Sequence, residues 1–125
     1  LPHGQNFGAT LPHIEPFKAM IYEVILSFFL MLVIISVATD TRAVGMMAGM
    51  AIGGTVALCA FIGGPITGAS MNPARSLAPN LFQGEISSLW IYFAGPFLGC
   101  LIAALTYNSI KCNDINETQN AKGCC

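Results

Sequence analysis

The sequence predicts an all-α membrane protein with three spanning helices and one short helix that enters the membrane without crossing it. Apolar residues make up 54% of the 125 residues and charged residues only 9%, whereas about a quarter of the residues in a soluble domain are charged. The apolar residues gather in three runs, each close to the ~20 residues that a helix needs to cross a bilayer. Because the net charge is −1, the chain offers no basic surface for nucleic acid. We therefore expect its partner to be the lipid bilayer.

The first sixteen residues, 1–16, are predicted to form a loop outside the membrane. Helix-breaking residues recur through this segment: Pro2, Gly4, Gly8, Pro12 and Pro16. It lacks the basic start and apolar core of a signal peptide, and it begins at Leu1 rather than methionine, so we expect a fragment or a processed piece. His3 and His13 lie in this loop and are expected to be solvated.

The spanning helices are expected at 17–38, 43–63 and 88–108. The apolar run of the first, 19–38, contains one charged residue, Glu23, and the apolar cores of the other two contain none. A soluble bundle of core helices is the alternative, but three charge-poor runs of this length argue against it.

Small residues recur every four positions in the second and third runs. The two series are Gly45, Gly49 and Gly53, and Gly95, Gly99 and Ala103. In lipid, such faces let helix backbones approach closely. We expect both series to lie at helix–helix contacts.

The segment 65–88, between the second and third spans, is too short and too interrupted to form another full crossing. Asn72 is a preferred N-cap and Pro73 is favoured at the first helical position, so a helix is predicted at 73–82. At 1.5 Å per residue it is roughly 15 Å long, about half of the hydrocarbon thickness. Its start would then lie near the middle of the membrane, and Pro79 predicts a kink or an early end.

The start of this half-helix has the chemistry of a pore wall. A helix N-terminus carries about half a positive charge, Arg75 adds a full one, and the Asn72 amide offers N–H donors. The small residues before it are expected to form an extended segment whose carbonyl groups face a cavity: Gly63, Gly64, Gly68 and Ala69. Neutral solutes that form hydrogen bonds are the expected passengers.

With these residues in place, the sequence resembles the C-terminal half of an aquaporin, a member of the major intrinsic protein family. "GASMNPARS" (68–76) resembles the second of that family's two Asn-Pro-Ala motifs, and "WIYFAGPFLG" (90–99) resembles its sixth helix. The resemblance runs from Phe7 to Tyr107 and implies that 17–107 is half of an inverted-repeat channel. It also implies a homotetramer for the full-length protein and no conduction by this half alone.

The resemblance assigns roles to individual residues of this sequence. It places the pore motif at Asn72, Pro73 and Ala74, and the selectivity filter at Ala60, Ala69 and Arg75. It implies that Glu23 braces the re-entrant loop from behind.

Three positions depart from the patterns of better-defined branches. Strict water channels usually carry histidine where this chain has Ala60, which leaves room and an apolar surface. Glycerol facilitators usually carry aspartate and a basic residue where this chain has Ser76 and Asn80. "ATDTRAVG" and "GGPITGASMNPARSL" instead resemble the nodulin-26-like branch and its bacterial relatives. This resemblance implies passage of water and small uncharged solutes such as glycerol, urea, boric acid or arsenous acid.

Two other transport functions stay open at this stage: a water-selective aquaporin, and a half-unit of an ion-coupled transporter. The transporter usually needs ionisable residues in its spans, and here the spans contain only Glu23. An enzyme is not expected, because no nucleophile–base pair or metal cluster is visible, and no cofactor or metal is expected either.

Charge and cysteine positions complete the predictions. Arg42, Lys111 and Lys122 fall on one side of the membrane and Lys18 on the other, so the positive-inside rule predicts a cytoplasmic tail at 109–125 in a multi-pass protein of the cell membrane. The cysteines in apolar runs, Cys59 and Cys100, are expected to be packing residues. The others lie in the tail, where the terminal pair is either unmodified or lipidated: Cys112, Cys124 and Cys125.

Overall fold

The computed structural model describes residues 8–39 and 46–111, and the regular structure in this part of the chain is helical. The elements are α1 (Pro16–Thr39), α2 (Met46–Thr67), α3 (Pro73–Gln83) and α4 (Leu89–Ile110). Of these, α1, α2 and α4 are long and apolar enough to cross a membrane, whereas α3 has only 11 residues. The predicted fold class, three spans plus one half-length helix, is confirmed.

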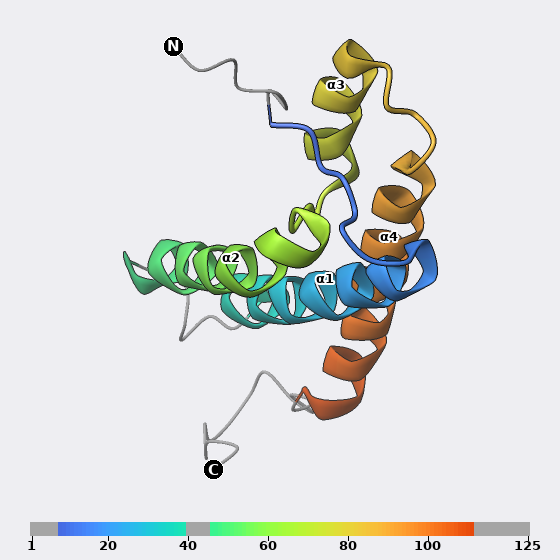
Figure 1. The fold of residues 1–125 in the computed structure, drawn as a ribbon. Helices are drawn as coiled ribbons and strands as arrows, with labels where there is room; N and C mark the ends of the chain where they lie inside the picture. Colours follow the sequence, from blue (N-terminus) through green and yellow to red (C-terminus); the bar gives the residue numbers. More distant parts are fainter. Residues whose placement is uncertain (1–7, 40–45, 112–125) are drawn as a thin grey trace, which may run out of the picture.

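Helix α1 is the centre of this arrangement. It packs against both α2 and α4, while α3 packs on α4. In Figure 1, α1 and α2 run side by side, α4 crosses α1, and the segment before α1 passes alongside α3. The start of α3 therefore lies where α1, α2 and α4 come together.

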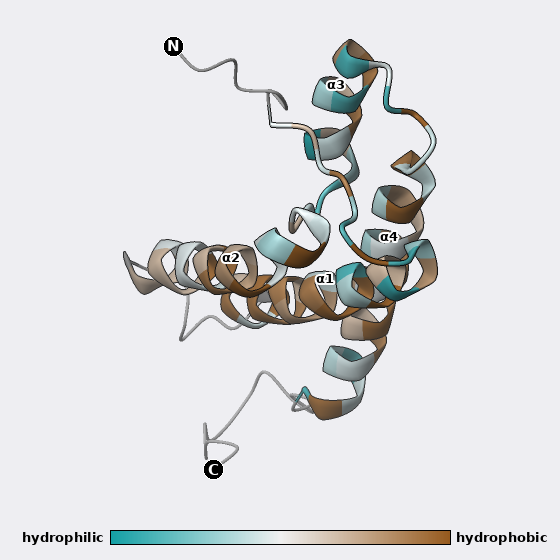
Figure 2. Cartoon of the chain, viewed as in Figure 1, coloured by the Kyte–Doolittle hydropathy of each residue, from teal (hydrophilic) through white to brown (hydrophobic). Residues whose placement is uncertain are grey.

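The outer surface of the three long helices is apolar (Figure 2). Phe61 on α2 is 83% exposed and Phe97 on α4 is 70% exposed. Large apolar side chains in these numbers would be unfavourable in water, since a soluble monomer rarely exposes large contiguous apolar patches. The surface is that of a protein embedded in lipid or covered by other membrane helices.

Only one of the two small-residue series packs in this chain. Gly95, Gly99 and Ala103 are all buried on α4, and a Cβ built on Gly99 would lie 2.4 Å from the Val24 carbonyl oxygen of α1. Gly49 has no neighbour within 4 Å of an added Cβ, and Gly53 has none either. Gly45 lies outside the described residues. The prediction of close packing is met on α4, whereas Gly49 and Gly53 make no such contact within the described residues.

Replacing Gly99 with alanine is expected to destabilise the fold. The new Cβ would also lie 2.9 Å from the Phe28 amide nitrogen, and because these neighbours are backbone atoms, α4 itself must move. Overpacking of this kind costs about 1–3 kcal/mol. Thermal unfolding of the detergent-solubilised complete polypeptide that carries this chain measures the effect. Gly49→Ala is the matched control, and an equal loss of stability in both variants would contradict the close packing.

Helix α2 extends beyond its predicted end at residue 63. It continues through Pro65 to Thr67, so Gly63 and Gly64 are helical rather than part of an extended approach. Proline removes one backbone donor, but the Gly68 amide still donates to the Gly64 carbonyl at 3.0 Å. The last turn is therefore retained, and the extended segment shrinks to the residues between α2 and Asn72.

Helix α3 is also longer than Pro79 predicts. It continues through this proline to Gln83, and Gly84 ends it with a φ of 75°. The Gly84 amide donates to the carbonyls of Asn80 and Leu81, which satisfies acceptors that a helix end leaves open. The expected early end at Pro79 is wrong, because the helix continues to this capped C-terminus.

Candidate functional site

The loop between α2 and α3 wraps around the carboxylate of Glu23. Glu23 is fully buried on α1. Its Oε1 accepts hydrogen bonds from the Thr67 hydroxyl at 2.7 Å and the Ser70 amide at 3.0 Å, and its Oε2 accepts one from the Met71 amide at 2.8 Å. The Ala69 amide donates to the Thr67 hydroxyl at 3.1 Å. The N–H groups of 69, 70 and 71 thus all point inward, to the Glu23 carboxylate or to the Thr67 hydroxyl that is bonded to it.

This inward turn of the amides requires unusual backbone angles. Ala69 has a φ of 44° and Met71 a φ of 52°, a left-handed conformation that costs a non-glycine residue roughly 1–3 kcal/mol. Charge-assisted hydrogen bonds to a carboxylate are among the strongest that backbone amides form. The buried Glu23 therefore stabilises a loop conformation that its own residues disfavour.

Directing the amides toward Glu23 leaves carbonyl oxygens on the opposite side of the loop. Arg75, on the first turn of α3, donates from its Nη1 to the Gly68 carbonyl at 3.0 Å and the Ala69 carbonyl at 2.8 Å. No carboxylate pairs with this guanidinium within the described residues. Arg75 is thus positioned by neutral carbonyls and retains its full positive charge.

The N-terminus of α3 is capped as predicted. The Asn72 Oδ1 accepts the Ala74 amide at 2.9 Å and Pro73 occupies the first helical turn. Because Oδ1 is occupied in this way, the side-chain NH₂ of Asn72 is the group left to donate. Among the described residues it has no recorded hydrogen-bond acceptor.

A second set of contacts, not foreseen from the sequence, ties the N-terminal segment to α3. Asn80 is fully buried and binds the Thr10 backbone at both ends: its Oδ1 accepts the Thr10 amide at 3.1 Å and its Nδ2 donates to the Thr10 carbonyl at 3.0 Å. The Thr10 hydroxyl donates to Ser76, which is hydrogen-bonded to Ser70, and the Ser70 hydroxyl donates to the Asn72 carbonyl at 2.8 Å. A chain of hydroxyl groups thus connects the segment before α1 to the cap of α3.

Tyr92 supplies a third support from α4. It is fully buried, and its hydroxyl donates to the Thr67 carbonyl at 2.7 Å. The end of α2 is therefore held from α1 by Glu23 and from α4 by Tyr92.

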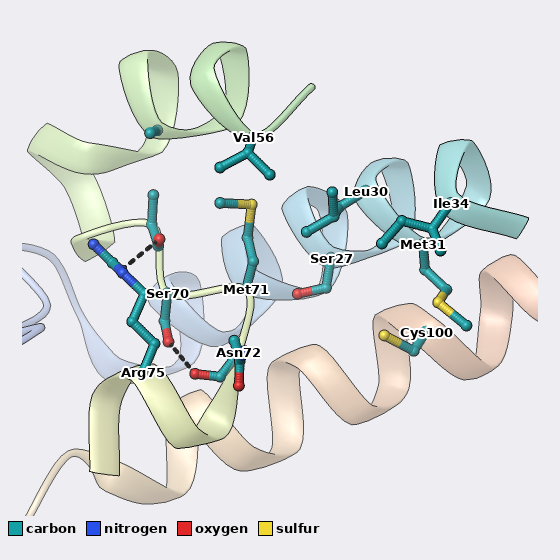
Figure 3. Close-up of a pocket in the computed structure, with 12 residues that line it drawn as sticks. Ser27, Leu30, Met31, Ile34, Val56, Ser70, Met71, Asn72, Arg75 and Cys100 are labelled. Atoms are coloured by element: carbon teal, nitrogen blue, oxygen red, sulfur yellow. Dashed lines mark hydrogen bonds between the residues drawn. The ribbon is translucent and has the colours of Figure 1, made fainter. Parts of the chain in front are cut away.

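These elements enclose one side of a cavity of about 350 Å³ (Figure 3). It has room for roughly ten waters at about 30 Å³ each. All three residues assigned to the filter line it, together with one residue of the motif: Ala60, Ala69, Arg75 and Asn72. Pro73 and Ala74 are not among the lining residues, and neither is Glu23. Most of the remaining lining is apolar and comes from α1 and α2, including Leu30, Met31, Ile34 and Val56.

The structure tests the predicted burial of two cysteines and the predicted exposure of one histidine. Cys59 is buried beside Leu26 and Ala69, as predicted for a packing residue. Cys100 is only partly buried and lines the cavity with Met31 of α1, so it is not the fully packed residue that was predicted. His13 is exposed. His3, Arg42, Lys122, Cys112, Cys124 and Cys125 lie outside the described residues.

Thr67, Tyr92, Thr10 and Asn80 are the supporting residues that sequence reasoning missed. One pattern could have revealed part of this set. Ser76 and Asn80 are four apart, so they share one face of a short helix, and a buried polar face needs polar partners.

Fold and site together define a class: an all-helical integral membrane protein in which a half-length helix starts inside a group of spanning helices, at a cavity that offers hydrogen-bond donors. The sequence profile of the family described as "Major intrinsic protein" matches residues 2–107. The chain belongs to the major intrinsic protein family.

Individual relatives place the chain within that family. It is 50% identical to Nodulin-26 of Glycine max over 115 residues, which cover 90% of this chain and 42% of that protein. It is 47% identical to Aquaporin NIP1-1 of Zea mays over 107 residues, which cover 86% of this chain and 38% of the relative. It is similar also to Putative aquaporin NIP4-1 of Arabidopsis thaliana, at 49% identity over 88% of this chain and 39% of the relative. The predicted resemblance to the nodulin-26-like branch is confirmed, and the chain spans about two fifths of the length of these relatives.

Proposed function

We propose that this chain is the C-terminal half of a passive channel for water and small uncharged solutes such as glycerol, urea, boric acid or arsenous acid. The observation that carries the proposal is the cavity that Ala60, Ala69, Asn72 and Arg75 line together. Asn72 and Arg75 present N–H donors there, and the opposite surface is apolar. A solute with an oxygen acceptor and no net charge fits both surfaces.

The charge at this cavity explains why ions would be excluded. Arg75 has no carboxylate partner among the described residues, and the N-terminus of α3 adds its partial positive charge. Glu23 could offset these charges, but its carboxylate accepts hydrogen bonds from the loop and does not line the cavity. A cation in the cavity would therefore meet Arg75 directly at the cavity wall, whereas the Glu23 carboxylate lies behind the loop.

The proposal extends to the complete protein. Residues 1–16 would form an extracellular loop, 17–107 the C-terminal half of the channel domain and 109–125 a cytoplasmic tail, with Lys111 on the cytoplasmic side. The missing half would supply the facing wall and the fourth filter residue. The complete protein would reside in the cell membrane as a homotetramer and perform no chemical reaction.

Osmotic swelling of proteoliposomes that contain the complete polypeptide tests this function. We expect gradients of glycerol and of urea to collapse faster than in protein-free vesicles, alongside rapid water flow. Water flow with exclusion of both solutes would instead indicate the water-selective alternative. Vesicles no more permeable than protein-free ones would refute a channel.

Replacing Ala60 with histidine is expected to narrow the channel. The imidazole ring adds volume and an N–H group at a cavity-lining position that now holds a methyl group. Glycerol and urea fluxes should fall by about tenfold or more, the effect of roughly 1.4 kcal/mol on the barrier, while water flow should change much less. Ala57→His, one turn earlier on α2 and outside the cavity lining, is the control. Unchanged glycerol flux in Ala60→His would remove Ala60 from the filter.

A further inference from the structure

The segment that precedes α1 contacts both flanks of the loop that carries Arg75 and its carbonyl partners. On the α2 side, the His13 amide donates to the Ile66 carbonyl at 3.0 Å. On the α3 side, Asn80 binds the Thr10 amide at 3.1 Å and the Thr10 carbonyl at 3.0 Å. Figure 1 shows this segment passing alongside α3 on its way to α1. We call residues 10–13 the strap.

The bonds that hold the strap to α3 are buried. Thr10 is 2% exposed and Asn80 is 0% exposed. A buried side-chain amide is costly unless both of its ends are hydrogen-bonded, and Asn80 meets this condition because its oxygen accepts and its NH₂ group donates. The two bonds involve the amide and the carbonyl of a single residue. Asn80 therefore fixes the backbone of Thr10 in one position against α3.

Thr10 in turn contacts two residues that determine where Arg75 lies. Its side chain packs on Gly68, since a Cβ built on Gly68 would lie 3.1 Å from both the Cβ and the Cγ2 of Thr10. The carbonyl of Gly68 accepts a hydrogen bond from Arg75 at 3.0 Å. The Thr10 hydroxyl donates to Ser76, the residue that follows Arg75 in α3. Thr10 thus supports both a carbonyl that Arg75 binds and the backbone from which Arg75 extends.

The hydroxyl chain that continues from Ser76 runs in one direction. Ser70 donates to the Asn72 carbonyl at 2.8 Å, which uses its only proton, so Ser76 is the donor in the bond between the two serines. Ser76 in turn accepts from Thr10. Hydrogen bonds in such a chain polarise and strengthen one another. Removal of the Thr10 hydroxyl would therefore weaken contacts as far as the cap of α3.

We propose that Asn80 and Thr10 are positioning residues of the selectivity filter, which tie the strap to α3 and thereby hold Arg75 in place at the cavity wall. This inference rests on the proposed channel function. Neither residue lines the cavity, so both act through Gly68 and Ser76 rather than by touching a solute. The segment before α1 thereby sets the size of the solute that the channel admits.

The size selectivity of solute entry tests this role. In proteoliposomes with the complete polypeptide, Asn80→Ala is expected to raise the permeability to erythritol, a longer polyol, relative to that to glycerol by about threefold, because Arg75 can then move away from the cavity wall. A loss of folded protein alone would lower both permeabilities together and leave their ratio unchanged. An unchanged ratio in a variant that conducts glycerol would overturn the positioning role and leave the channel function intact. Failure of the unsubstituted protein to conduct would overturn both.

Substitutions of Thr10 keep the proposal testable if Asn80→Ala does not fold. Thr10→Val retains the shape of the side chain and both backbone bonds to Asn80 but lacks the hydroxyl, so it should raise the same ratio. Thr10→Ser retains the hydroxyl and should stay closer to the unsubstituted protein. The matched control is Thr55→Val, which removes a hydroxyl that donates to Ala51 on α2 at 2.8 Å and should leave the ratio unchanged. Equal ratios in Thr10→Val and Thr55→Val would overturn the role of the hydroxyl chain in the filter.

Discussion

Replacing Arg75 with alanine is expected to raise the permeability of the channel to protons and small cations by roughly tenfold or more. A unit charge about 10 Å away contributes about 1.7 kcal/mol at an effective dielectric constant of about 20, and each 1.4 kcal/mol changes a rate about tenfold. Since this guanidinium has no carboxylate partner among the described residues, its removal eliminates that barrier. The shorter side chain should also let larger neutral solutes pass.

Proton flux, followed with a pH-sensitive dye inside proteoliposomes, measures the first effect, and solute-driven swelling measures the second. Arg75→Lys separates charge from geometry. It keeps the positive charge, so the cation barrier should remain. It loses the planar donor group that binds the carbonyls of Gly68 and Ala69, so discrimination among neutral solutes should weaken. Proton and solute permeabilities that are unchanged in Arg75→Ala would contradict the proposed role of Arg75.

Replacing Glu23 with alanine is expected to disrupt the loop that carries the site. The amides of Ser70 and Met71 would lose their acceptors, and each unsatisfied buried amide costs about 1–3 kcal/mol, or about 2–6 kcal/mol for the two. The left-handed conformations of Ala69 and Met71 would lose their stabilisation too. We expect a lower melting temperature in detergent and loss of solute flux.

A glutamine at position 23 gives a graded comparison. Its one oxygen can still accept from the loop, but its NH₂ group would face an amide that also donates. Glu23→Gln should therefore retain the fold and lose part of the stability, between the unsubstituted protein and Glu23→Ala. The exposed Glu15, paired with Lys18 on the surface at 2.9 Å, offers the control: Glu15→Ala should have little effect, because surface pairs contribute about 0–1 kcal/mol. Equal stability of Glu23→Ala and Glu15→Ala would contradict the role of Glu23 in the loop.

The sequence predicts the elements of this fold well because hydropathy sets them. Long charge-poor runs define α1, α2 and α4, and the pair Asn72–Pro73 defines the first residue of α3. Helix ends were harder to predict. Helix α2 continues past its expected end at residue 63 and through Pro65, where the Gly68 amide still bonds the Gly64 carbonyl. Pro79 suggested an early end of α3, but that helix continues to its cap at Gly84.

Ala60, Ala69, Asn72 and Arg75 could be predicted to line the cavity because they lie in one short motif or at the fixed distances from it that the family resemblance supplies. Of the residues that hold this motif in place, the resemblance gave only Glu23, and not its partners. Glu23 and Thr67 are 44 positions apart, and Thr10 and Asn80 are 70 apart, so their contacts depend on how the helices pack.

The dependence of solute entry on ion gradients tests the central claim most directly. Initial rates of glycerol entry into proteoliposomes that carry the complete polypeptide would be compared with a proton or sodium gradient imposed in either direction and with no gradient. A passive channel predicts equal rates in all conditions and no accumulation above the external concentration. Entry that rises with an inward gradient, or uphill accumulation of solute, would contradict the account and indicate an ion-coupled transporter.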